Sequence, residues 1–227
     1  MGAQACGIQV RMPDRAEMAR SSYQGARKPQ AQVLLELEDG GSRTVLVPVR
    51  VARALNEQEF PFPCEVDEAC ERIGALESRL CFTVLTEMIS RREYSVEEAR
   101  GKLALYGYRP ADIDAAISRA CDLRFLDDVR FVSGFIEGRK QRGWGRRKIE
   151  AELKRRGIDP ARIEGYPDAY FDEEDDLARA RALLARKTVP ESKAYEKLVR
   201  HLMAKGFSYA IASTAVREVL AEDGLAR

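Results

Sequence analysis

The chain has 227 residues, of which 45% are hydrophobic, enough for one large domain or a few small modules with a buried core. Lys and Arg number 38 against 37 Asp and Glu, so the total charge indicates no partner and only its distribution is informative. No apolar run approaches the about 18 residues of a membrane span, and the start lacks the pattern of a signal peptide. The five cysteines are never spaced as C-x-x-C. We therefore expect reduced thiols, a cytoplasmic location and no membrane partner.

The N-terminal part of the chain divides into two predicted segments. Residues 1–30 carry no sustained periodicity and mix Gly, Gln, Ala, Ser and Arg, which predicts a flexible tail. Residues 31–65 are predicted to form a small N-terminal module. The β-favouring runs Val33–Glu38 and Arg43–Val47 flank a Gly pair, which is typical of a β-hairpin. Pro48 is expected to end the second strand.

An internal repeat dominates the rest of the chain. The pattern apolar-x3-Leu-x3-Gly-apolar occurs three times, with its leucine at Leu103, Leu153 and Leu202, 50 and 49 positions apart. The leucine and the apolar residue four positions before it share one helix face, which points into a core. The glycine is expected to end each helix in a left-handed cap, since glycine adopts that conformation without steric strain; the three are Gly107, Gly157 and Gly206.

Further helices are predicted on both sides of each Leu/Gly pattern. Apolar residues at helical spacing precede it, and a short helical stretch follows it, at Pro110–Arg119, Pro160–Gly165 and Tyr209–Leu220. This spacing predicts three three-helix repeats, over residues 66–122, 123–170 and 171–227. The expected fold class is therefore all-α, with three tandem three-helix repeats in an elongated curved array and a small N-terminal extension that contains a β-hairpin.

The middle repeat carries the strongest local charge. Nine basic residues lie within one predicted helix–turn–helix, against Glu137, Glu150 and Glu152, so nine positive minus three negative charges give about +6. The nine are Arg139, Lys140, Arg142, Arg146, Arg147, Lys148, Lys154, Arg155 and Arg156. Clustered Lys and Arg attract polyanions by releasing counterions, and Arg can bind phosphate with two parallel hydrogen bonds. We predict that these nine residues bind DNA or a DNA-bound filament; the alternative is a solvated, Arg-rich helix face.

Neighbouring residues have two interpretations each. Trp144 could stack on a nucleic-acid base, or it could be an apolar anchor that closes the loop between two helices. Asp127 and Asp128 could bind a metal ion, but helix capping is the favoured interpretation. The acidic run Asp172–Asp176 could cap the next helix, or it could pair with a basic face of a neighbouring repeat or of a partner.

The sequence lacks the motifs of common catalytic and cofactor sites. It contains no G-x-x-x-x-G-K-[ST] loop for nucleotide triphosphates and no G-x-S-x-G nucleophile turn. The single His201 has no second His and no ligand-spaced Cys, which argues against a zinc site. We therefore expect no enzyme activity, no cofactor and no bound metal.

Two stretches of the repeats carry a family resemblance. The run Phe125–Phe131, followed by the pattern Gly145–Ile158, resembles the central signature of the RecX family, and Arg200–Tyr209 resembles its C-terminal repeat. The resemblance covers about residues 75–220, and the correctly spaced pair of motifs is more specific than either alone. The acidic start of the third repeat, at Phe171, departs from the family pattern, so contacts of the family at that junction are not transferred to this chain.

The resemblance implies a non-catalytic regulator of DNA recombination, DNA repair and the SOS response. RecX-type proteins bind RecA filaments on single-stranded DNA and inhibit the recombinase, ATPase and coprotease activities. The expected partners are therefore the RecA filament and single-stranded DNA, bound by a monomer; end-capping and filament disassembly stay open as mechanisms. Two alternatives remain from the residues, a helical-repeat adaptor that binds protein alone and a general DNA-binding protein. Reversing Arg146, Arg147 and Lys148 to Glu is predicted to weaken binding without unfolding the chain.

Overall fold

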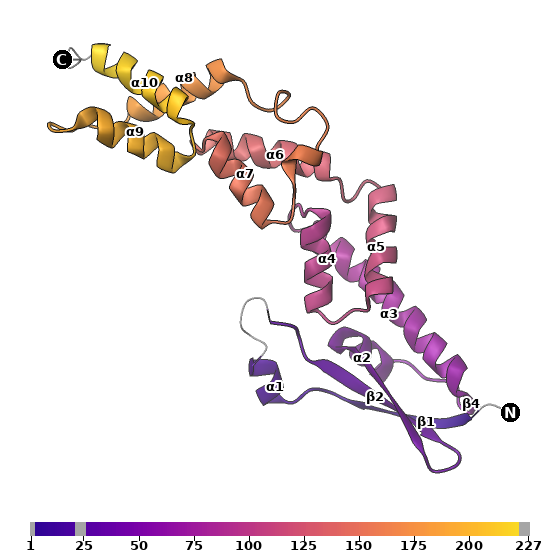
Figure 1. Cartoon of the computed structure of the whole chain (residues 1–227). Coiled ribbons are helices and arrows are strands. Elements are labelled where there is room, and N and C mark those ends of the chain that lie inside the picture. The colour runs from indigo at the N-terminus through magenta and orange to yellow at the C-terminus, as the bar shows by residue number, and fades with distance from the viewer. Residues whose placement is uncertain (1–2, 21–25, 223–227) are drawn as a thin grey trace. The chain divides into compact units, whose positions relative to one another are not determined.

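The computed structural model describes residues 3–20 and 26–222. These residues form two compact units, Met1–Asp127 (unit 1) and Asp128–Arg227 (unit 2) (Figure 1). Within the described ranges, no helix is both long and apolar enough to cross a membrane.

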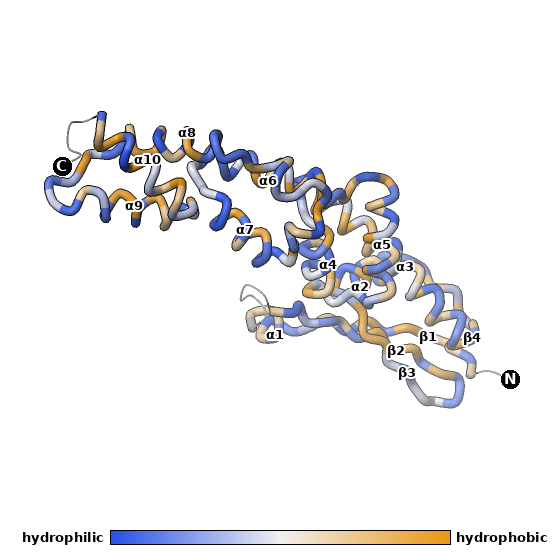
Figure 2. The backbone as a smooth tube through the Cα atoms, turned by 45° about the horizontal axis from the view of Figure 1, so that its top comes forward, coloured by the Kyte–Doolittle hydropathy of each residue, from blue (hydrophilic) through white to orange (hydrophobic). Residues whose placement is uncertain are grey.

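Unit 1 begins with a four-stranded antiparallel sheet in the order β3-β2-β1-β4. Its strands are β1 (Gln4–Arg11), β2 (Gln30–Leu37), β3 (Ser42–Pro48) and β4 (Cys64–Glu65). Ala31, Val33 and Leu35 alternate along β2 and are fully buried, because successive side chains of a strand point to opposite faces of the sheet. Figure 2 shows the resulting hydrophobic stretches along β1 and β2.

The sheet corrects two expectations from the sequence. The predicted hairpin is confirmed, since β2 and β3 pair from Gln30 with Pro48 to Glu36 with Ser42. A flexible tail over residues 1–30 is wrong for residues 4–11, because β1 pairs with β2 and with β4 and buries Ala5. The all-α class is therefore wrong for this part of the chain. The pairing partners of β1 lie far along the sequence, so its own Gly- and Gln-containing stretch carries no clear strand pattern.

Four helices complete unit 1 after its short first helix, α1 (Arg15–Arg20). They are α2 (Val49–Asn56), α3 (Val66–Ile89), α4 (Val96–Leu105) and α5 (Pro110–Asp122). Buried residues of the sheet and of α2 to α5 form one continuous hydrophobic cluster. The N-terminal sheet and the first group of three helices thus share a single core rather than folding around separate ones.

Unit 2 contains the other two groups of helices. The first group has α6 (Asp128–Gln141), α7 (Arg146–Arg155) and the short 3-10 helix η1 (Pro160–Arg162); the second has α8 (Glu173–Leu184), α9 (Ala194–Lys205) and α10 (Tyr209–Glu222). Each group has its own hydrophobic cluster, one centred on Ile136, Ile149 and Leu153 and the other on Leu202 and Phe207.

The predicted glycine caps are confirmed in all three groups. Gly107, Gly157 and Gly206 have φ angles of 90°, 78° and 98°. In each case the next residue donates its backbone N–H to the carbonyl of the pattern leucine, as Phe207 does to Leu202 over 3.2 Å. These are the hydrogen bonds of a Schellman motif. The apolar residue after each glycine is buried, which folds the chain back onto the last helical turn.

The helix expected over Pro160–Gly165 is replaced by a single 3-10 turn followed by irregular turns. Asp159 caps this turn, because its carboxylate accepts a hydrogen bond from the Ala161 N–H at 3.2 Å. Gly165 has a left-handed φ of 74°, and Pro167 disfavours the α conformation of the residue before it. The three-helix pattern is thus complete in two of the three groups. The curved array and the repeat boundaries stay predictions.

Candidate polyanion-binding surface

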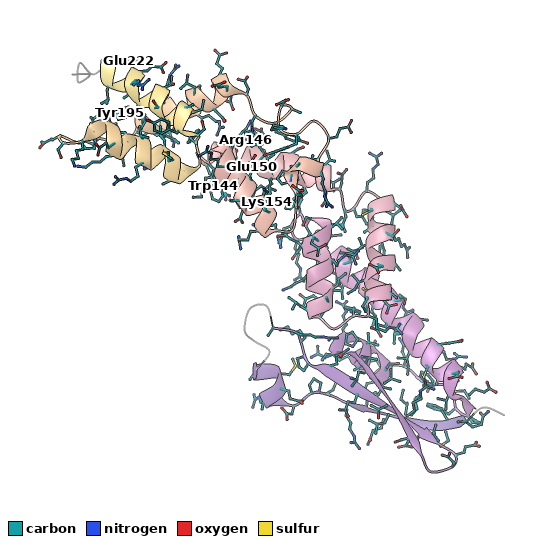
Figure 3. The ribbon with its side chains drawn as sticks, viewed as in Figure 1. Trp144, Arg146, Glu150, Lys154, Tyr195 and Glu222 are labelled. Atoms are coloured by element: carbon teal, nitrogen blue, oxygen red, sulfur yellow. The ribbon has the colours of Figure 1, made fainter. Side chains whose placement is uncertain are left out.

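The predicted basic cluster lies on the end of α6, on α7 and on the loop between them. Helix α7 follows the rule that residues three or four apart share a face. Ile149 and Leu153 are fully buried, whereas the opposite face exposes Arg147, Ala151, Lys154 and Arg155. Figure 3 shows the helix with Arg146 at one end and Lys154 near the other. The helix therefore anchors itself by two apolar side chains and presents cations on its outer face.

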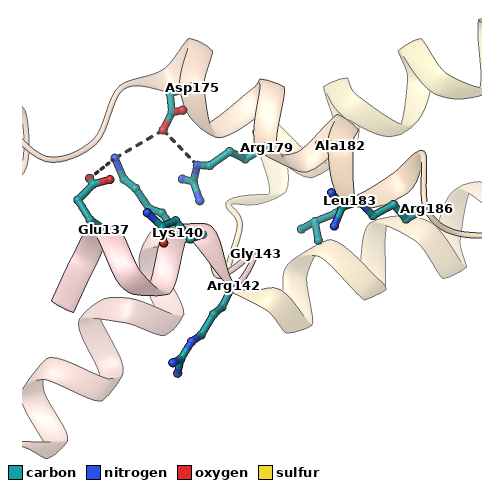
Figure 4. Close-up of a pocket in the computed structure, with 10 residues that line it drawn as sticks. Glu137, Lys140, Arg142, Gly143, Asp175, Arg179, Ala182, Leu183 and Arg186 are labelled. Carbon is teal, nitrogen blue, oxygen red and sulfur yellow. Dashed lines mark hydrogen bonds and ion pairs between the residues drawn. The ribbon is translucent and has the colours of Figure 1, made fainter. Parts of the chain in front are cut away.

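Three of the nine predicted cations are exposed and unpaired. Arg142, Arg147 and Lys154 have no side-chain ion pair within residues 3–20 and 26–222. Arg142 lies just after α6, and Figure 4 shows its side chain pointing away from the ion pair of Lys140 with Asp175. Exposed cations that form no ion pair are available to an external anion, with an attraction that salt screens. We define these three residues as the open cations.

Arg155 is exposed but paired. Its Nη2 lies 2.7 Å from Glu152 Oε1, and the side chain is 72% exposed. Hydrogen bonds from Arg155, and secondarily from Arg156, outweigh the effect of burial and lower the pKa of Glu152 to about 2. Glu152 is therefore ionised at neutral pH and cancels part of the positive charge at this end of α7.

The Arg146 side chain forms an ion pair within unit 2. Its Nε donates to Glu150 Oε1 over 2.8 Å, and the Tyr166 hydroxyl donates to the same oxygen over 2.6 Å. Burial raises the pKa of Glu150, but the hydrogen bonds from Tyr166 and Arg146 outweigh it, so the pKa lies below its ordinary value. Glu150 thus fastens the segment after η1 to α7 through Tyr166, and it pairs with the charge of Arg146.

Trp144 is surrounded by cations in the loop between α6 and α7. The Arg139 guanidinium lies 4.9 Å from the centroid of its ring and the Lys148 ammonium 4.3 Å. The half-buried ring belongs to the edge of the hydrophobic cluster of α6 and α7. These contacts favour the anchor interpretation of Trp144, because cations next to an aromatic ring bind it through its electrostatic field.

Ion pairs and a hydrogen bond join the two helix groups of unit 2. Lys140 Nζ lies 3.5 Å from Asp175 Oδ2, across the gap between α6 and α8, and its side chain is only 13% exposed. Arg179, also on α8, donates to the carbonyl of Trp144 over 2.8 Å and pairs with Asp175 and Asp176. The acidic run Asp172–Asp176 therefore both caps a helix and pairs with basic residues, the two roles that the sequence left open. Asp172 caps α8 by accepting a hydrogen bond from the Asp175 N–H at 2.9 Å, and the next carboxylates bind basic residues of both groups.

A cavity of about 650 Å³ opens beside this ionic network (Figure 4). It is lined by residues of α6 and α8 and of the segments that directly follow them, including Arg142 and Arg186. Sequence reasoning missed Arg179 of α8 and Arg186, which follows α8, because these residues lie about one repeat away along the chain and carry no local motif. The contact of Arg179 with the loop at Trp144 is visible only in the structure.

The nine predicted residues therefore fall into distinct environments. Arg142, Arg147 and Lys154 are open, Arg155 is exposed and paired, and five are half-buried: Arg139, Lys140, Arg146, Lys148 and Arg156. The open cations can bind phosphate oxygens without breaking an existing contact. Among the described residues, no group of three or more His, Cys, Asp or Glu side chains could hold a metal ion. The chemistry that this surface offers is charge recognition.

Comparisons with known proteins identify the fold and the family. The family model described as RecX, second three-helix domain, matches residues 127–165. The regulatory protein RecX of Vibrio campbellii is 36% identical over 130 residues, which span 54% of this chain and 81% of the relative. That of Legionella pneumophila strain Corby is 32% identical over 141 residues, 61% of this chain and 93% of the relative.

Two solved structures support the same fold. A crystal structure of RecX from Lactobacillus salivarius aligns with 64% of this chain and 97% of its own, with a TM-score of 0.56 and 19% identity. A second crystal structure of regulatory protein RecX aligns with 97% of this chain and 99% of its own, with a TM-score of 0.55 and 16% identity. With these relatives and the matched second three-helix domain, the chain belongs to the RecX family.

Proposed function

We propose that this protein is a non-catalytic regulator of RecA that binds RecA filaments on single-stranded DNA and inhibits their recombinase, ATPase and coprotease activities. Family membership supports the regulatory role, since the relatives are named regulatory proteins. The observation that carries the binding mode is the outer face of α7, where Arg147 and Lys154 are exposed and unpaired in the described part of the chain. The protein acts as a cytoplasmic monomer and needs no cofactor.

The open cations neutralise DNA phosphate or an acidic surface of the filament. Arg147 and Lys154 are seven residues apart on α7, two helical turns, which places both side chains on one face about 10 Å apart along the axis. Because Arg and Lys side chains are long and flexible, both cations can contact phosphate groups of one strand at the same time. The half-buried cations set the shape of the surface instead of binding the partner.

The two helix groups of unit 2 work as one block in this proposal. Gly145 donates its N–H to the Lys205 carbonyl over 2.8 Å, and Gly206 accepts from the Arg147 N–H over 3.0 Å. These backbone bonds hold the N-terminus of α7 against the C-terminus of α9. A rigid block presents its contacts to successive filament subunits together, which raises the overall affinity without a strong individual site.

The test compares two triple charge reversals of the full chain. R142E/R147E/K154E reverses the open cations. K187E/K197E/R200E makes the same change in net charge on exposed residues of the α8–α10 group. Binding to RecA filaments on a single-stranded oligonucleotide is measured between 50 and 300 mM salt, a range chosen around the about 150 mM physiological value. The first variant should bind at least about tenfold more weakly, with a salt slope smaller by about 2, since each neutralised phosphate contributes about 0.7.

The outcomes separate the proposal from its two rivals. Equal affinities and equal salt slopes for both variants would rule out the open cations as the contact surface. Binding that needs no DNA and does not depend on salt would favour a protein adaptor. Equally tight binding to the naked oligonucleotide would favour a general DNA-binding protein.

A further inference from the structure

Unit 1 contains a second cavity of about 650 Å³, distant in sequence from the basic surface of unit 2. It lies where the start of α2 and the C-terminal half of α3 meet the segments around α4, and we call it the tyrosine pocket. Tyr94, Tyr106 and Tyr108 line it, with Val84 and Met88 of α3 supplying buried apolar contacts. Its volume falls within the range of about 300–1,000 Å³ that is usual for sites of small molecules.

The charges around the tyrosine pocket are strongly one-sided. Lys28, Arg50, Arg53 and Arg91 line it, against Glu87 as the one lining carboxylate, which leaves four positive minus one negative charge. Arg50 binds Glu87 with two hydrogen bonds of 2.5 and 2.6 Å. The other three cations have no ion pair among residues 3–20 and 26–222. Such a rim attracts a ligand with several negative charges, because low-dielectric walls concentrate the field of the cations.

The rings add a second kind of recognition. Tyr94 and Tyr106 are half-buried at the pocket wall. Cations already lie over both rings, with the Arg92 guanidinium 3.5 Å from the Tyr94 centroid and the Lys102 ammonium 5.3 Å from that of Tyr106. These contacts hold the rings in place against the pocket. Fixed aromatic surfaces bind flat rings of a ligand at small entropic cost, as stacking of bases on tyrosine does.

Tyr108 supplies an independent sign of a missing partner. The residue is 3% exposed, and its hydroxyl oxygen has no hydrogen-bond partner within the described ranges of the chain. Buried hydroxyl groups are almost always hydrogen-bonded, so an unpaired one calls for an explanation. Burial raises the pKa of Tyr108, with its neighbours Cys81 and Glu77 acting in the same direction. The hydroxyl therefore keeps its proton at neutral pH and can donate it to an acceptor atom.

From the size, the charge, the rings and the unpaired hydroxyl together, we infer that the tyrosine pocket binds a nucleoside phosphate. The phosphate groups lie against Arg53, Arg91 and Lys28, the base lies against the tyrosine rings, and the Tyr108 hydroxyl donates a hydrogen bond to the ligand. This site is separate from the open cations of unit 2 and does not depend on the function proposed for them. The same chemistry is present in a free nucleotide and in a nucleotide of a single strand, so the experiment tests both.

The experiment uses the full chain with R142E/R147E/K154E as its background, so that the basic surface of unit 2 does not contribute. A fluorescent ATP analogue labelled on the ribose is titrated at low salt and then displaced by ATP, by tripolyphosphate or by a short oligo-dT strand. We expect saturable binding that R53E and R91E each weaken at least tenfold. R79E is the matched control, because Arg79 is exposed on α3 and does not line the pocket; it should change affinity less than twofold.

Y108F separates a ligand contact from a structural role. The substitution removes only the unpaired hydroxyl, so the melting temperature should stay the same or rise, while nucleotide affinity falls three- to tenfold. Displacement by oligo-dT at lower concentration than by ATP would assign the site to a strand, and the reverse would assign it to a free nucleotide; both support the inference. Absence of saturable binding, equal effects of R53E, R91E and R79E, or displacement by tripolyphosphate as effective as by ATP would overturn it.

Discussion

Gly145 and Gly206 lie backbone to backbone at the junction of the two helix groups of unit 2. A Cβ atom placed on Gly145 would lie 2.4 Å from the carbonyl carbon of Gly206 and from the nitrogen of Phe207. Next to this contact, the Gly145 N–H donates to the Lys205 carbonyl over 2.8 Å. The close approach is what allows the hydrogen bonds to form, so both positions are restricted to glycine by packing.

Substitution of Gly145 by Ala should therefore open the junction. The new methyl group meets backbone rather than a side chain that can move, and overpacking of this kind costs about 1–3 kcal/mol. The free energy of unfolding, measured with urea, should fall by that amount. G138A is the matched control, because a Cβ on this α6 glycine meets nothing within 4 Å. It should stabilise the protein by about 0.5–1 kcal/mol, since glycine is unfavourable inside a helix; equal effects of the two substitutions would contradict the account of the junction.

The stability of the protein should depend on the guanidinium group of Arg179 and not only on its positive charge. Its guanidinium donates to the Trp144 carbonyl, binds Asp175 and Asp176, and lies 5.6 Å from the centroid of the Phe207 ring. Lysine cannot make these directed contacts at once. R179K and R179Q should therefore both lower the free energy of unfolding by about 1–3 kcal/mol. Near-native stability of R179K would show that charge alone suffices.

Charge reversal should lower stability at Arg146 and filament binding at Arg147. R146E places a carboxylate beside Glu150, which Arg146 now binds at 2.8 Å, so we expect a loss of stability of about 1–3 kcal/mol. R147E changes an exposed side chain and should alter stability by less than about 0.5 kcal/mol while weakening filament binding. Urea unfolding and filament binding are measured on both variants. A stable R146E protein, or an R147E protein that binds normally, would contradict the division of the cluster into paired and open cations.

The ion pairs of Glu152 should make part of the stability depend on pH. Its pKa in the folded protein is about 2, below the ordinary value of 4.5. A carboxylate with a lowered pKa stabilises the fold fully above its ordinary pKa and loses this contribution as the pH falls toward the folded value. The difference in unfolding free energy between wild type and E152Q should therefore be largest above about pH 5 and vanish near about pH 2. Because Arg155 is largely exposed, the difference should not exceed about 1 kcal/mol; a difference that is constant over this range would refute the assignment.

The sequence predicts the glycine-capped helix ends well because their signals are local. Each helix that ends in a Schellman cap carries its leucine and its glycine within four residues of each other, as Leu202 and Gly206 do. The spacing of these residues therefore predicts both the buried face of the helix and the residue at which it ends. The hairpin of β2 and β3 is predicted for the same reason, since its strands are joined by a short turn.

Features that depend on distant contacts are not predicted. Strand β1 becomes a strand by pairing with β2 and β4, and neither pairing leaves a pattern within residues 4–11. The helix expected after Pro160 stops after one turn, because the backbone is already extended at Ile163, ahead of Gly165 and Pro167. In the basic cluster, the sequence identifies the charged residues but not whether each of them is exposed or paired. The sequence cannot distinguish Arg146, which Glu150 neutralises, from its neighbour Arg147 on the exposed face.

The RecA ATPase on single-stranded DNA tests the central claim most directly. The protein is added at rising ratios, from far below one molecule per RecA protomer up to excess, and the R142E/R147E/K154E variant is measured in parallel. The account predicts that wild type lowers the ATPase at substoichiometric ratios and that the variant requires at least about tenfold more protein for the same effect. An ATPase that does not change at excess protein and low salt, or that both proteins inhibit equally, would contradict it.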